Sequence, residues 1–122
     1  MIKKILTVSR DRTILLARND VLAIAGFSVS SPRTPAEAVH ILATSEVAVI
    51  VLGHSVPKAE REELCGQFRE IRPDVPIIVL YDVEAEDDEL ADAFVPAHAG
   101  PEVLIQAIQL CLRERDSKRR PA

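Results

Sequence analysis

The chain has 122 residues, of which 48% are hydrophobic and 28% are charged, and its formal net charge at pH 7 is −4. This composition fits one globular domain and excludes disordered and collagen-like classes. The acidic balance argues against nucleic acid as the main partner, because binding a phosphate backbone needs a positive face. No apolar run is long enough to span a membrane and no signal-peptide pattern opens the chain, so we expect a cytoplasmic protein with no membrane partner.

The first thirty residues predict a strand, a helix and a second strand. Residues 4–8 form the first strand pattern, and residues 12–25 carry apolar side chains at helical spacing. Asp11 is placed to cap this helix at its start, and Gly26 is placed to end it. Residues 27–30 predict a short second strand.

A second helix and a central strand follow. Thr34, Pro35 and Glu37 have the spacing of a capping box with proline at the first helical position, which predicts a helix over residues 34–43. Residues 47–53 form an unbroken run of apolar or tiny side chains, mostly β-branched. Such a run is typical of a strand covered by helices on both faces, so we place it at the centre of a parallel sheet.

The second half of the chain continues the alternation of strand and helix. Residues 58–71 predict a third helix, and residues 77–81 predict a second fully apolar strand. The acidic segment 84–92 can supply only a short helix. Residues 93–95 predict a short fifth strand, and a final helix is expected over residues 101–113, again with a proline near its first position.

Alternating strands and helices with short connections predict an α/β fold with a single doubly wound parallel sheet. We expect one domain over residues 1–114 and a basic C-terminal tail over residues 115–122, which is polar enough to fray. Cys65 and Cys111 lie in helical patterns and are expected to be small buried residues of a reducing compartment. Two isolated cysteines do not make a metal site, so we expect neither a metal nor another cofactor.

Short segments spread over nearly the whole chain match, in the same order along the sequence, the pattern of a known family. They cover residues 3–8, 25–29, 56–57, 76–80, 94–96 and 101–104. Together these segments resemble a two-component response-regulator receiver domain. The resemblance implies a flavodoxin-like five-stranded sheet with strand order 2-1-3-4-5 and about five helices, of which the fourth is short.

The residues that carry phosphorylation in receivers do not carry over to this chain. Receivers place an acidic pair after strand one, where this sequence has Ser9 and Arg10. They place the phospho-accepting aspartate at the end of strand three, where Gly53 stands. They place a Thr or Ser after strand four, where we align Tyr81, and a lysine after strand five, where we align Ala97. The resemblance is therefore to a degenerate receiver, or pseudo-receiver.

The chemistry of phosphoryl transfer supports the same expectation. Transfer to a carboxylate needs that carboxylate and a Mg²⁺ ion held by oxygen ligands. Gly53 offers no nucleophile, and Arg10 puts a fixed positive charge where the metal would bind. A shifted alignment could place Asp11 at one of the acidic positions after strand one, but position 53 would still lack a phospho-accepting carboxylate. We therefore expect no aspartyl phosphorylation.

Two histidines and a serine near the strand ends leave a second function open. His54, Ser55 and His98 would support nucleophilic chemistry if Asp11 or Asp82 oriented a histidine base. The simpler interpretation is that His54 and Ser55 cap the next helix or bond loop backbone. No Gly-x-Ser-x-Gly elbow accompanies them, and no glycine-rich loop follows the first strand to cradle a phosphate.

Arg10 has two interpretations as well. In the first it pairs with Asp11 or Asp82 and forms a polar lid over the former pocket, and in the second it imitates the metal and fixes one conformation. The first is favoured, since exposed charges usually find local partners. The alternative function is a small ligand-binding or hydrolytic domain that uses a crevice formed by Arg10, His54 and Ser55.

The last predicted helix is apolar over more than one face, which predicts a second contact beyond the sheet. Its candidate contact residues are Leu104, Ile105, Ile108 and Leu112. The first helix shows the same excess, so both helices are candidates for a homodimer contact. The six acidic residues of segment 84–92, among them Glu86 and Asp87, either steer a basic partner or form a solvated face.

The main expectation is a stand-alone receiver-like module that is not an enzyme. It would transduce signals by contact with an unidentified signalling protein, independently of phosphorylation. The basic tail is either a frayed end or a weak contact with nucleic acid or with an acidic block on another copy.

Overall fold

The computed structural model describes residues 2–82 and 91–119. The strands in this part of the chain are β1 (Lys4–Val8), β2 (Ser28–Ser30), β3 (Val47–Leu52), β4 (Ile77–Tyr81) and β5 (Ala93–Pro96). The helices are α1 (Arg12–Ile24), α2 (Pro35–Thr44), α3 (Lys58–Ile71) and α4 (Pro101–Arg119). No helix within the described ranges combines the length and the apolar character that crossing a membrane requires.

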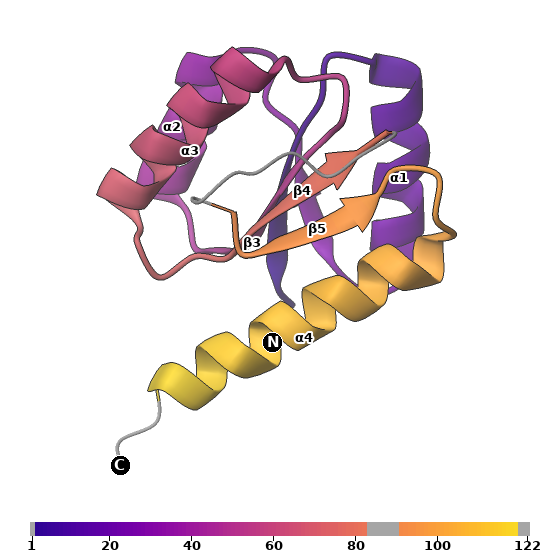
Figure 1. Ribbon diagram of the computed structural model, residues 1–122. Helices are drawn as coiled ribbons and strands as arrows, with labels where there is room; N and C mark the ends of the chain where they lie inside the picture. The colour runs from indigo at the N-terminus through magenta and orange to yellow at the C-terminus, as the bar shows by residue number, and fades with distance from the viewer. Residues whose placement is uncertain (1, 83–90, 120–122) are drawn as a thin grey trace.

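The five strands form one parallel sheet in the order β2-β1-β3-β4-β5. Helices α1 and α4 cover one face of this sheet, and α2 and α3 cover the other (Figure 1). This confirms the predicted fold class and strand order. The order of the strands reverses between β1 and β3, so the loops that follow these two strands flank the switch point of the sheet, where open α/β folds bind ligands.

The core has two layers, one on each face of the sheet. Central strand β3 has all six residues buried. Its Ile50 and Leu52 belong to the cluster under α2 and α3, where Phe68 is fully buried. Its Val49 and Val51 belong to the cluster under α1 and α4. This double burial explains why β3 is a continuous apolar run instead of an alternating one.

The helix starts predicted from the sequence are confirmed by their capping bonds. The carboxylate of Asp11 accepts a hydrogen bond from the backbone N–H of Ile14, 3.1 Å away. Thr34 Oγ1 accepts from the N–H of Glu37, also at 3.1 Å. The Glu37 carboxylate completes a variant of the capping box, because it accepts from the N–H of Arg33 rather than from that of the cap residue.

The stop signal of α1 is confirmed as well. Gly26 follows the helix with φ of 99°, a left-handed conformation that side chains disfavour. The predicted short helix over 84–92 falls largely outside the described residues, and Ala91 and Asp92, which are described, are not helical.

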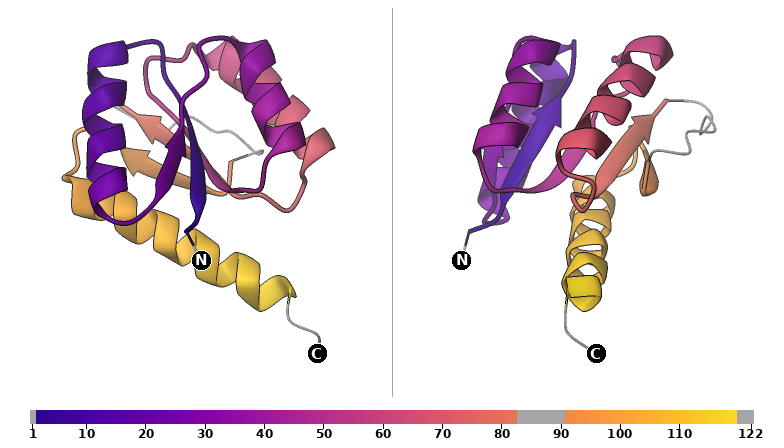
Figure 2. Two further views of the ribbon diagram at one scale, coloured as in Figure 1. Left: turned by 180° about the vertical axis from the view of Figure 1, so that it is seen from behind. Right: turned by 90° about the vertical axis from the view of Figure 1, so that its left-hand side faces the viewer.

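Helix α4 is longer than the sequence predicted. It continues to Arg119 instead of ending near residue 113, so residues 115–119 of the predicted tail are helical. Figure 2 shows the extra turns extending past the edge of the sheet. Arg115 explains part of this length, because its side chain is only 10% exposed and pairs with Asp74 at 2.9 Å. The same guanidinium donates to the carbonyl of Ala48 at 3.0 Å, which ties the extension to the start of β3.

Candidate functional site

The candidate site lies at the carboxyl edge of the sheet, where the loops after β1 and β3 meet. The centre of this site is the hydroxyl of Ser55. Its Oγ accepts from the backbone N–H of Arg10 at 2.9 Å and from that of Asp11 at 3.2 Å. It also lies 2.9 Å from Ser9 Oγ. The structure therefore brings Ser9, Arg10, Asp11 and Ser55 together.

The hydrogens of this network can be assigned by counting. A serine hydroxyl has one hydrogen and two acceptor lone pairs. Ser55 accepts from the N–H of Arg10 and from that of Asp11, which is shared with Ser9 Oγ at the same distance of 3.2 Å. With both acceptor positions of Ser55 engaged, Ser55 donates its own hydrogen to Ser9 Oγ. Ser9 then donates to the carbonyl of Asp11, 3.3 Å away. The network is neutral and uses every hydroxyl hydrogen, and it joins the two loops.

Gly53 is packed too closely for a side chain to enter freely. Its N–H donates to the carbonyl of Val8 at 2.7 Å. A Cβ at this position would lie 3.2 Å from both Cβ and Oγ of Ser9 and 3.2 Å from that carbonyl. These distances are shorter than ordinary van der Waals contact, so a side chain at position 53 would displace Ser9.

Arg10 turns away from the carboxylates that the sequence offered as partners. Its Nη2 lies 2.5 Å and its Nε 2.9 Å from Oε2 of Glu60 on α3. The prediction that Arg10 pairs with Asp11 or Asp82 is therefore wrong. Asp11 instead caps α1, and Asp82 lies 2.5 Å from the ring of His98.

The far side of the crevice is built from the loops after β4 and β5. The N–H of Ala97 donates to the carbonyl of Tyr81 at 2.6 Å, which holds these two predicted positions together through backbone alone. The rings of His54 and His98 lie 6.1 Å apart at an angle of 50°. Among the described residues, no hydrogen bond joins Ser55 to either histidine.

These contacts favour the simpler interpretation of Ser55. Its hydroxyl bonds loop backbone, as the simpler interpretation predicted, and its hydrogen points to another serine instead of to a base. It does not cap the next helix, because Pro57 holds the N-cap position of α3 and provides no side-chain bond. The Nδ1 atom of His54 is buried without a hydrogen-bond partner.

The predicted contact surface of α4 needs correction. Ile108 is fully buried and Leu104 is 8% exposed, because both pack on the sheet within the core. Ile105 and Leu112 are partly buried at the edge of the same cluster. The exposed apolar side chains of α4 are instead Val103 and Leu110. Residues Glu86 and Asp87 lie outside the described part of the chain.

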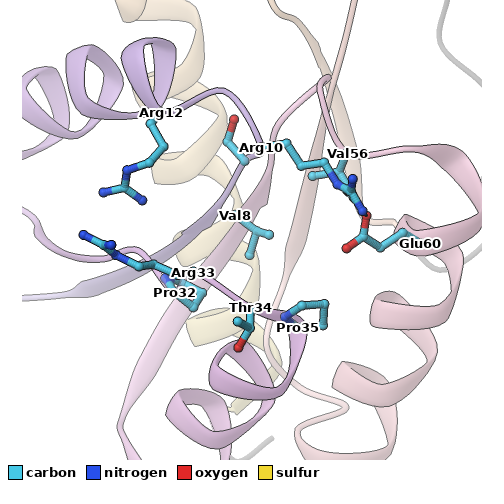
Figure 3. Close-up of a pocket in the computed structure, with 10 residues that line it drawn as sticks. Val8, Arg10, Arg12, Pro32, Arg33, Thr34, Pro35, Val56 and Glu60 are labelled. Atoms are coloured by element: carbon cyan, nitrogen blue, oxygen red, sulfur yellow. Dashed lines mark hydrogen bonds and ion pairs between the residues drawn. The ribbon is translucent and has the colours of Figure 1, made fainter.

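A pocket adjoins the hydroxyl network on its α2 side (Figure 3). Its volume is about 410 Å³, and Arg12, Arg33 and Glu60 line it together with Ser9 and Arg10. Our interpretation of the sequence missed the first three of these. One signal was available, since Arg33 lies in the loop after the second strand and loops at the carboxyl ends of parallel strands share one edge of the sheet. Within the described residues, no three His, Cys, Asp or Glu side chains group closely enough to hold a metal ion.

Comparison with known proteins identifies relatives of this chain by sequence. No family model matches the chain. The chain is 28% identical over 116 residues to the response regulator MprA of Mycobacterium leprae and 27% identical over the same length to that of Mycobacterium sp. strain KMS. Both matches cover 90% of this chain but only 51% and 50% of the relatives, so the chain spans about half their length.

Solved structures agree on the architecture. A CheY-like receiver domain from Methanospirillum hungatei superposes with a TM-score of 0.85 at 22% identity, covering 97% of this chain and 99% of the other. The chemotaxis protein CheY4 of Vibrio cholerae gives a TM-score of 0.80 at 21% identity, covering 92% of this chain and all of the other. The fold is thus the CheY-like form of the flavodoxin-like class. The sequence relatives are response regulators, and the solved receiver domains share the fold of this chain.

Proposed function

We propose that this chain is a receiver module that transduces signals by protein contact and without phosphorylation. The observation that supports the proposal is the edge where β1 and β3 end. A glycine stands there in place of the phospho-accepting carboxylate, and the neutral network of Ser9 and Ser55 fills the adjoining space. The module performs no chemistry of its own in this proposal.

The chemical reason is the requirement of the transfer step. An aspartyl phosphate forms only where a carboxylate attacks, and the charge on the phosphoryl oxygens needs a metal held by oxygen ligands. Gly53 provides no attacking atom, and the nearby Asp11 is occupied as the cap of α1. Arg10, which follows the strand where receivers hold an acidic residue, is paired with Glu60.

The test is incubation with a small phosphodonor and Mg²⁺, followed by intact mass measurement under neutral conditions. A phosphorylatable receiver treated in parallel controls for donor quality. We expect no mass increase for this chain and a gain of one phosphoryl group for the control. An acid-labile phosphoryl adduct on this chain would refute the proposal.

We further propose that the signalling contact, including contact with a second copy, uses the face formed by α1 and α4. The two helices touch each other on one side of the sheet. Their exposed apolar side chains are Ile14, Leu16, Ile24, Val103 and Leu110. Leu16 is 54% and Leu110 52% exposed, so both would gain from burial against a partner.

Light scattering coupled to size exclusion tests the homodimer. We expect the wild-type chain to have the mass of a dimer at high protein concentration, and Leu16→Asp combined with Leu110→Asp to have the mass of a monomer. Ala59→Asp, at an exposed position of α3 on the other side of the sheet, is the matched control and should not change the mass. A wild-type monomer at every concentration would exclude the homodimer.

A further inference from the structure

The pocket beside the hydroxyl network has the position of a ligand site. It is enclosed by the loops that follow β1, β2 and β3, together with the first turns of α1, α2 and α3 (Figure 3). It therefore spans the reversal of strand order between β1 and β3, where ligands bind in open α/β sheets. Its volume of about 410 Å³ lies within the range that small-molecule sites occupy.

The charge of this pocket opposes that of the whole chain. Its lining holds Arg10, Arg12 and Arg33 but only one carboxylate, Glu60, so three positive charges and one negative leave a local charge of +2. The complete chain has a formal net charge of −4. A positive concave site on an acidic protein concentrates anions at that site and repels them elsewhere.

Two of the three guanidinium groups have no partner among the described residues. Glu60 is taken by Arg10. No hydrogen bond or ion pair of the Arg12 or Arg33 side chain occurs in the described part of the chain, and Figure 3 shows both extending on the same side of the pocket, toward one another. Two like charges that converge repel each other unless an anion lies between them.

The remaining lining of the pocket is apolar and suits an organic group. It consists of Val8, Pro32, Pro35 and Val56. Pro32 is buried and Val56 is 2% exposed, so these two side chains form a fixed floor. Thr34 lies between the floor and the arginines. Its hydroxyl accepts from the N–H of Glu37 and keeps its own hydrogen for donation.

We propose that this pocket binds an organic phosphate. Arg12 and Arg33 hold the phosphate oxygens, because a guanidinium donates two parallel hydrogen bonds to such a group. The Thr34 hydroxyl adds a donor, and the N-terminal end of α2 behind it adds a favourable dipole. The apolar floor receives the organic part. This site is independent of the proposed absence of phosphorylation, since neither Gly53 nor a metal takes part in binding.

Isothermal titration at low salt tests the proposal with ATP, GTP and inorganic pyrophosphate as probes and adenosine as the neutral comparison. We expect at least one nucleotide to bind, more tightly than pyrophosphate does, and adenosine to give no measurable heat. Arg12→Ala and Arg33→Ala should each weaken nucleotide binding at least tenfold. Arg113→Ala, which removes an exposed arginine on α4, should leave binding unchanged.

The variants are interpretable because the Arg12 and Arg33 side chains are exposed and form no hydrogen bond or ion pair with the described residues, and thermal melts of each variant check that the fold is kept. Absence of heat with all three anionic probes would overturn the proposal. So would binding that both arginine variants retain, or pyrophosphate binding as tight as that of the nucleotides. Mass measurements with phosphodonors bear on the proposed function alone, so the two can fail separately.

Discussion

Replacement of Ser55 by alanine tests the hydroxyl network that joins the loops after β1 and β3. The substitution removes bonds to two backbone N–H groups and to Ser9. At about 1 kcal/mol net for each bond, the sum is about 3 kcal/mol. Both N–H groups lie on an exposed loop where water replaces part of the loss, and the N–H of Asp11 keeps Ser9 Oγ as an acceptor. We therefore expect a decrease of about 2 kcal/mol in the free energy of unfolding.

The expected decrease converts to a shift in melting temperature. With about 2.1 cal/mol/K of unfolding entropy per residue, 122 residues give about 0.26 kcal/mol/K, so about 2 kcal/mol lowers Tm by about 8 °C. Thermal and urea melts measure it. Ser28→Ala, at an exposed hydroxyl on edge strand β2, is the control and should change stability by less than about 0.5 kcal/mol.

A double-mutant cycle separates the network from a simple loss of polarity. Ser9→Ala and Ser55→Ala share the bond between the two hydroxyl groups, so the double variant should lose less than the sum of the single losses. The coupling should be at least about 0.5 kcal/mol. A Ser55→Ala protein that melts within about 2 °C of wild type, or strictly additive losses, would refute the hydrogen-bonded network of Ser9 and Ser55.

Three further outcomes follow from buried polar groups. Thr7→Val should cost about 1 to 3 kcal/mol in urea melts, because the fully buried hydroxyl bonds two polar side chains that would lose their partner. Arg115→Ala should cost about 2 kcal/mol and fray the end of α4 in hydrogen exchange, whereas Arg113→Ala should not. Burial and nearby carboxylates raise the pKa of Cys111 from 9.0 to about 11, so iodoacetamide at pH 8 should label it only after unfolding.

The raised pKa of Cys111 also sets the sign of a pH dependence. Between pH 9 and about 11 the unfolded thiol loses its proton while the folded one keeps it. The folded state then binds more protons than the unfolded state, so stability falls as pH rises through this window. Cys111→Ser should flatten this part of the stability curve, and an unchanged slope would assign the dependence to other groups.

The features predictable from the sequence are those fixed by neighbouring residues. The caps at Asp11 and Thr34 and the stop at Gly26 act within one helical turn, and the structure confirms all three. The central strand was equally clear, since a strand buried on both faces needs apolar side chains at every position. Local rules therefore gave the order of elements and, with the family resemblance, the order of strands.

The features that failed depend on residues distant in sequence. Arg10 pairs with Glu60, which lies 50 positions away, and no local pattern marks that partner. Helix α4 extends beyond its apolar pattern because Arg115 forms hydrogen bonds with Asp74 and Ala48, which lie 41 and 67 positions earlier in the sequence. Leu104 and Ile108 were predicted to form an outside contact but are buried on the sheet. The helix is apolar over more than one face, so its sequence does not indicate which face meets the sheet. Tertiary contacts override local preference in each case.

The edge where β1 and β3 end has a physical consequence for regulation. The carboxylates of a cluster repel one another and are stable together only with a bound cation. The geometry of such a cluster therefore changes when a metal or a phosphate binds. The pair Ser9 and Ser55 is neutral and internally hydrogen-bonded, so in the proposed module the geometry of this edge depends on neither metal nor phosphate. A ligand shifts a conformational equilibrium only by binding one state better than another. In the proposed module that differential affinity must come from a protein partner or from an anion held by Arg12 and Arg33.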